Sequence, residues 1–197
     1  MSSHHFVKDG QEPALIIEGF TQPHQVHDLL EWAPQVIVFE KALPAMQLLG
    51  IKADVVFADP ASLDAIASQL EYQMPVTILP SPEEAMLCKA FDLLVELGQR
   101  YVCVTVNRLQ NHFELSAPYL GRLEINFFEE NMKWSSVVSR KFEKWMPSGA
   151  TFFVSTASNF RVDGPAEQLN ENSVRTLSDS LIAIHCEAPF WVGEPLQ

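Results

Sequence analysis

The stretch Asp54-Val-Val-Phe-Ala-Asp-Pro-Ala-Ser62 decides the fold class of the chain. Its nearly unbroken apolar run, Asp54–Ala58, is typical of a strand buried on both faces, because a strand with one wet face alternates polar and apolar residues. Gly50 before it is the usual residue after a helix end, and Ser62 can cap the next helix. The stretch therefore predicts a strand between two helices, as in a parallel sheet covered on both faces.

The same alternation extends outward in both directions, as far as about Pro118. Apolar runs of strand length recur between segments whose apolar residues have helical spacing, so we predict a five-stranded α/β half. Its further strands are predicted at Ala14–Ile17, Val36–Phe39, Val76–Leu79 and Tyr101–Val106, and its helices over Leu43–Leu49, Leu63–Leu70 and from Ser81 to Leu97.

After Pro118 the pattern changes to short strands separated by turn signals such as Pro147-Ser148-Gly149 and Asp163-Gly164-Pro165. We predict an N-terminal parallel α/β sandwich over residues 1–120 and a small antiparallel β-sandwich domain over residues 121–197. A β module of about 70 residues can barely hold its own core, so we expect it to pack on the α/β half or on a second subunit. Its strands are predicted at Leu123–Phe128, Ser135–Val138, Thr151–Ser155, Ser173–Thr176, Leu181–Cys186 and Phe190–Val192.

Composition excludes several classes of partner. The chain has 197 residues and a formal net charge of −12, and its few basic residues do not cluster, so we expect no nucleic acid and no anionic membrane surface as partner. No apolar run approaches the ~18 residues of a spanning helix. The three cysteines, Cys88, Cys103 and Cys186, are scattered, which favours a reducing, cytoplasmic location over a disulfide framework.

The order of the two halves and several local motifs resemble the thiamine pyrophosphokinase family over nearly the whole chain. Family members carry Gly-Ile-x-Pro-Asp followed by a strand that ends in Gly-Asp-Phe-Asp-Ser. Here Gly50-Ile51-Lys52-Ala53-Asp54 precedes a strand that ends in Ala58-Asp59-Pro60-Ala61-Ser62, so Asp54, Asp59 and Ser62 match at the family spacing. Asn107-Arg108-Leu109-Gln110-Asn111-His112 is similar to the family segment after the fifth strand, and Thr176-Leu177-Ser178-Asp179 to its thiamine-site segment.

The resemblance implies transfer of a pyrophosphoryl group from ATP to thiamine, with Mg²⁺ held by carboxylates, in a homodimer whose thiamine site lies at the subunit interface. Such a reaction depends on positioning and on neutralising phosphate charge. The residues that the resemblance assigns to catalysis are Asp59, which is also the metal ligand, Glu40, Glu83 and Glu84. Those assigned to substrate binding are Arg108, His112, Ser178 and Asp179.

The chain departs from the family pattern where the family has acids. Ala61, Met86 and Asn111 stand at acidic positions of the family, and Lys41-Ala42 replaces a Gly-Gly turn that lets backbone N–H groups approach phosphates. The loss of one well-placed electrostatic group costs about 10²–10³ in rate. We therefore expect a divergent member with weak or lost pyrophosphoryl transfer that binds a thiamine-like or nucleotide ligand.

Other interpretations stay open. Glu83 and Glu84 are well explained as acids in the first turn of a helix, which is the better-supported interpretation of the two residues, and Asp59 is equally explained as the end of a strand. The chain is an active pyrophosphokinase, using Mg²⁺ and ATP, if Glu40, Asp59 and Glu83 or Glu84 converge on one ion. It is a non-catalytic ligand-binding or protein-interaction module if Lys41 and Met86 fill that cleft instead.

Overall fold

The computed structural model describes residues 12–20, 22–31, 35–156 and 159–196. The chain forms two compact units, one ending at Ile125 and one starting at Asn126. Each unit is described by itself below.

The first unit is built around a parallel sheet with strand order β5-β1-β2-β3-β4. Its longest helix, α4, has 11 residues. Within the described residues, no helix combines the length and the apolar character needed to cross a membrane. The strands are β1 (Ala14–Ile17), β2 (Val36–Phe39), β3 (Val55–Ala58), β4 (Thr77–Pro80) and β5 (Tyr101–Val106). The helices are α1 (Pro23–Leu30), α2 (Leu43–Leu48), α3 (Leu63–Gln69), α4 (Met86–Glu96) and α5 (His112–Ser116), with 3₁₀ turns η1 (Glu40–Ala42), η2 (Glu71–Gln73), η3 (Glu83–Ala85) and η4 (Ala117–Tyr119).

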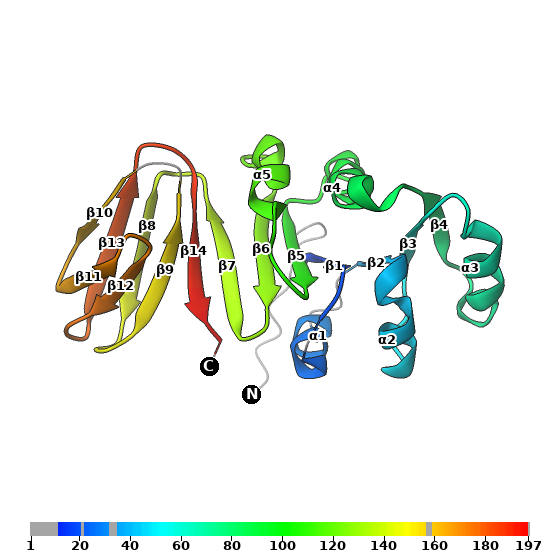
Figure 1. The fold of residues 1–197 in the computed structure, drawn as a ribbon, viewed down its shortest axis with the longest axis horizontal. Helices are drawn as coiled ribbons and strands as arrows, with labels where there is room; N and C mark the ends of the chain where they lie inside the picture. The colour runs from blue at the N-terminus through cyan, green and yellow to red at the C-terminus, as the bar shows by residue number, and fades with distance from the viewer. Residues whose placement is uncertain (1–11, 21, 32–34, 157–158, 197) are drawn as a thin grey trace, which may run out of the picture. The chain divides into compact units, whose positions relative to one another are not determined.

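Helices cover both faces of this sheet. One face packs against α1, α2 and α3, whose Val26, Met46 and Ile66 share a buried cluster with residues of β1, β2 and β3. Figure 1 shows α4 and α5 on the side of the sheet opposite α1 and α2. Every residue of β1, β2 and β3 is buried, as expected of strands with two covered faces. Because β1 pairs in parallel with both β2 and β5, the carboxyl ends of these three strands lie side by side.

The second unit is a sandwich of two antiparallel sheets (Figure 1). The larger sheet has the order β11-β12-β9-β14-β7-β6 and the smaller one the order β10-β13-β8. Apolar side chains from both sheets, among them Phe152, Ile182 and Phe190, form one buried core between them. The strands are β6 (Glu124–Glu129), β7 (Met132–Val137), β8 (Lys141–Met146), β9 (Thr151–Ser155), β10 (Phe160–Asp163), β11 (Ala166–Asn170), β12 (Ser173–Thr176), β13 (Ser180–Cys186) and β14 (Phe190–Pro195).

A glycine in the middle of the larger sheet accommodates an aromatic ring. Gly193 of β14 lies opposite Trp134 of β7 and Phe153 of β9. A Cβ at position 193 would lie 2.9 Å from three ring atoms of Trp134. The two aromatic rings are in contact, with centroids 6.4 Å apart. The missing side chain therefore lets the indole lie over the backbone of β14.

The predicted fold class is confirmed: a parallel α/β arrangement is followed by an antiparallel β module. The structure adds three strands that the sequence did not predict, β8, β10 and β11, and each is the edge strand of its sheet. Edge strands carry charged and polar residues that weaken a strand pattern, and β8 has Lys141, Glu143 and Lys144 in six residues. The cap predicted at Ser62 was wrong in one respect, because its side chain makes no capping hydrogen bond.

Candidate functional site

A polar cavity of about 460 Å³ opens at the carboxyl ends of β1, β2 and β5 in the α/β unit. This edge is where open parallel sheets usually bind ligands. The apolar side chains of Phe39, Leu87 and Leu115 line part of it. The polar lining consists of Glu18, Lys41, Glu83, Glu84, Asn107, Arg108, Gln110, Asn111 and His112.

Glu18, the residue after β1, links two other polar groups of the cavity, Lys41 and His112. Its backbone N–H donates to the carbonyl of Thr105 at 3.1 Å, so the residue extends the pairing of β1 with β5. One carboxylate oxygen lies 3.0 Å from Nζ of Lys41 and the other 2.9 Å from Nε2 of His112. The Glu18 side chain is only 14% exposed and that of His112 8%, so their contact is shielded from water, whereas the Lys41 side chain is 47% exposed.

His112 is held in one tautomer by its surroundings. The backbone N–H of Gln110 donates to Nδ1 of the imidazole at 3.1 Å, so Nδ1 is an acceptor. Nε2 therefore carries the hydrogen that it donates to Glu18. The His112 side chain is buried at the start of α5, where it fixes the direction of the Glu18 carboxylate.

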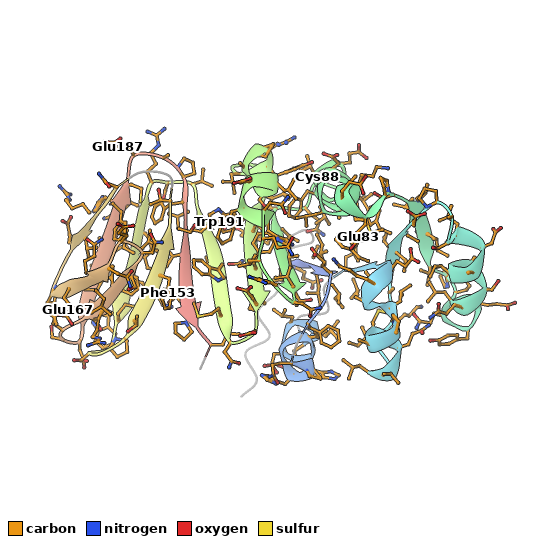
Figure 2. The ribbon with its side chains drawn as sticks, in the orientation of Figure 1. Glu83, Cys88, Phe153, Glu167, Glu187 and Trp191 are labelled. Atoms are coloured by element: carbon orange, nitrogen blue, oxygen red, sulfur yellow. The ribbon has the colours of Figure 1, made fainter. Side chains whose placement is uncertain are left out.

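Lys41 lies between two carboxylates of unequal exposure. The 3₁₀ turn η1 begins directly after β2 and places the Lys41 ammonium 3.0 Å from Glu18 and 3.4 Å from Glu83. Glu83 belongs to η3, before α4, the helix that carries Cys88 (Figure 2), and its side chain is 72% exposed.

The contacts among these charged and polar side chains shift the pKa values of Glu18 and Lys41. Burial alone would raise the pKa of Glu18, but the hydrogen bond from His112 and the ammonium of Lys41 outweigh it and lower that pKa. Burial alone would lower the pKa of Lys41, but its hydrogen bonds and charge attraction to Glu18 and Glu83 raise it. Both groups are therefore charged at neutral pH, and Lys41 is a fixed cation of the cavity.

A close backbone approach positions Asn107, another residue that lines the cavity. A Cβ on Gly19 would lie 2.7 Å from Nδ2 of Asn107, nearer than real Cβ contacts allow. The Gly19 N–H also donates to the carbonyl of Thr105. A glycine after Glu18 thus lets the Asn107 amide lie against the end of β1.

The structure brings four of the predicted site residues to this cavity, namely Glu83, Glu84, Arg108 and His112. Glu40 and Asp59 contact each other outside the lining, where Glu40 accepts a hydrogen bond from the Asp59 N–H at 2.8 Å. Asp59 in turn accepts one from the Ala61 N–H at 2.9 Å. These bonds hold the turn after β3, and the roles of these acids in catalysis stay predictions.

Ser178 and Asp179 lie in the β unit, in the turn before β13. Asp179 accepts a hydrogen bond from the Ser148 N–H at 2.7 Å, and the Ser178 carbonyl accepts one from the Ser180 hydroxyl at 3.0 Å. In the described contacts both residues therefore stabilise turns. Their role in ligand binding stays a prediction.

Sequence reasoning missed Glu18, Asn107 and Gln110. A signal for Glu18 was present, because it is an acid that directly follows a buried strand, the same position that singled out Asp59. Asn107 and Gln110 lie in a loop, where no periodicity marks a side chain that faces a ligand.

The donor groups that face the cavity do not fit a divalent cation. A Mg²⁺ ion is held through carboxylates and other oxygens, whereas here an ammonium lies between Glu18 and Glu83. In the part of the chain that the structure describes, no group of three or more His, Cys, Asp or Glu side chains is arranged to hold a metal ion.

Comparison with solved structures places the fold. Thiamine pyrophosphokinase from Bacillus subtilis aligns with 94% of this chain and 99% of its own, with a TM-score of 0.66 and 12% identity. The chain has the fold of the thiamine pyrophosphokinases. The enzyme from Geobacillus thermodenitrificans gives a TM-score of 0.68 at 12% identity over 93% and 97% of the two chains, and the yeast enzyme 0.60 at 8% over 98% and 88%. No family model and no curated protein sequence matches the chain.

Proposed function

We propose that this chain is a divergent relative of the thiamine pyrophosphokinases that binds a small ligand, thiamine-like or a nucleotide, with weak or lost pyrophosphoryl transfer. The proposal includes a homodimer, as the resemblance to the family implies, and a cytoplasmic location, which the scattered cysteines favour. ATP and Mg²⁺ are the cofactors only if transfer survives.

One observation carries the proposal: the polar cavity lies at the edge of the sheet where ligands usually bind, but an ammonium lies between two of its carboxylates. Lys41 contacts Glu18 and Glu83 where a transferase that uses a metal needs carboxylates free to bind it. The polar lining, with Arg108, Asn107 and His112, supports ligand binding. The substituted acids, Ala61 and Met86 among them, support weak or lost transfer.

The test combines binding and chemistry on one sample of the full chain. Thermal unfolding is followed at fixed protein concentration with thiamine, with ATP and Mg²⁺, and with both, and AMP release is measured in parallel. A ligand present at about 100 times its dissociation constant stabilises the native state by about 2.7 kcal/mol, a shift of several degrees. Light scattering on the same sample measures the mass and tests the homodimer.

Three outcomes are distinguishable. A ligand-induced shift without AMP release supports a binding protein on this fold. A shift with AMP release at rates typical of kinases, about 1–100 s⁻¹, contradicts the loss of transfer and shows an active enzyme. No shift with any ligand contradicts the proposal and leaves a protein-interaction module as the alternative.

A further inference from the structure

The two carboxylates that flank Lys41 are held very differently. Glu18 is 14% exposed and has a second partner in His112, so it stays in place. Glu83 is 72% exposed, and its oxygen lies 3.4 Å from the Lys41 ammonium, at the long end of hydrogen-bonding distance. Exposed ion pairs of this kind contribute about 0–1 kcal/mol. A ligand group can therefore displace Glu83 from Lys41 at small cost, but not Glu18.

The position that Glu83 occupies is suited to an oxyanion. The lysine ammonium is a compact cation that binds phosphate or carboxylate oxygens as a point charge. Arg108 lines the same cavity and is exposed, so a second cation is available for the same ligand. Glu18 supplies one negative charge against the two positive charges of Lys41 and Arg108, so it cancels only part of this positive charge.

We propose that Lys41 supplies the positive charge of this cavity and binds an oxyanion group of the ligand without a divalent metal. When no ligand is bound, the Glu83 carboxylate occupies the position of that oxyanion beside Lys41. This inference rests on the proposed function, since it describes how the same cavity takes its ligand. The ligand class is a small molecule that carries a phosphate or carboxylate group. Because Lys41 supplies the charge, added Mg²⁺ does not strengthen binding.

The test measures binding of ATP, inorganic pyrophosphate and succinate by isothermal titration calorimetry, in EDTA and again with Mg²⁺. The first two probes carry phosphate and the third carboxylate, so they separate the two sources of an oxyanion. Thiamine, which has no oxyanion, is the fourth probe. Glu83→Gln and Glu84→Gln are matched variants, since both remove one negative charge from the cavity lining and only Glu83 contacts Lys41.

We expect at least one oxyanion to bind in EDTA. Glu83→Gln tightens that binding about two- to fivefold, the value of an exposed ion pair, and Glu84→Gln changes it by clearly less. Lys41→Met weakens it at least tenfold, and Lys41→Arg retains part of it, because the charge is kept while the geometry changes. Far-UV circular dichroism and a thermal melt of each variant establish that it is folded.

The inference fails if oxyanion binding requires Mg²⁺, if the two Glu→Gln variants behave alike, or if folded Lys41→Met binds as the unchanged chain does. It also fails, while the proposed function stands, if thiamine binds and no oxyanion does. If none of the four probes binds any variant, the proposed function fails with it.

Discussion

Replacement of Glu18 by Gln tests whether the negative charge of Glu18 also contributes to the free energy of unfolding. The substitution keeps the shape of the side chain and removes its charge. It can still accept the hydrogen bond from His112, but the ion pair with Lys41 is lost. Hydrogen bonds to charged groups contribute about 1.5–3 kcal/mol each, and the neutral bond that remains about 0.5–1.5 kcal/mol. Part of this loss is offset because the neutral Gln avoids the cost of burying a charge. We therefore expect the free energy of unfolding at pH 7 to fall by about 2 kcal/mol.

The stability difference between the unchanged chain and Glu18→Gln should depend on pH in a definite direction. The pKa of Glu18 is lowered from 4.5, so its contribution is fully present above about pH 4.5 and is lost as the pH falls through the lower, folded-state value. Below that value Glu18 is protonated in the unchanged chain as well. The difference in unfolding free energy between the two proteins should therefore shrink in acid.

Urea unfolding between pH 3 and pH 7, followed by circular dichroism at 222 nm, measures this difference. All the helices of the described residues lie in the α/β unit, so the helical signal reports on the unit that contains Glu18. Glu84→Gln is the control, expected to change stability by less than about 0.5 kcal/mol. A stability gap for Glu18→Gln that is the same at pH 3 and pH 7 would refute the reasoning, as would an unchanged stability at pH 7.

Two glycine substitutions should have opposite kinds of effect. Gly193→Ala places a Cβ 2.9 Å from the ring of Trp134, so we expect about 1–2 kcal/mol lower stability in chemical unfolding, and no such cost in a Trp134→Val background. Gly19→Ala meets only the end of the exposed Asn107 side chain, so its stability cost should stay below about 1 kcal/mol. Gly19→Ala should instead weaken ligand binding severalfold, as much as Asn107→Ala does, and the double variant should bind no more weakly than either single variant. A large loss of stability in Gly19→Ala, or binding losses that add fully in the double variant, would contradict this.

The sequence predicted the centre of the α/β unit well because β1, β2 and β3 are buried on both faces. A run such as Val36–Phe39 has no polar residue, and its bounds agree with the structure. The strands that escaped prediction, such as Ala166–Asn170, lie at sheet edges. Their sequences mix polar with apolar residues because solvent, rather than a second layer, faces much of the strand, and a mixed run of four to six residues resembles a loop.

The site was only partly predictable for a different reason. A residue's place at a strand end can be read from the sequence, and Glu40 and Asp59, which the family resemblance assigned to catalysis, each directly follow a strand. Which strand ends are neighbours is decided by strand order, and here β1 lies between β2 and β5. That order brings Glu18 to Lys41 and His112. The carboxylates of Glu40 and Asp59 instead both accept hydrogen bonds from backbone N–H groups of the turn after β3.

The position of β1 between β2 and β5 also has a consequence for synthesis. The ribosome releases Glu18 94 residues before His112, and Thr105, which anchors its backbone, emerges only with β5. Until then one edge of a wholly apolar strand lacks its neighbour, and such edges favour pairing with other chains. A chain that stops before β5 would lose the cavity and expose this edge at once. The cavity and the protection from aggregation are thus completed by the same late step.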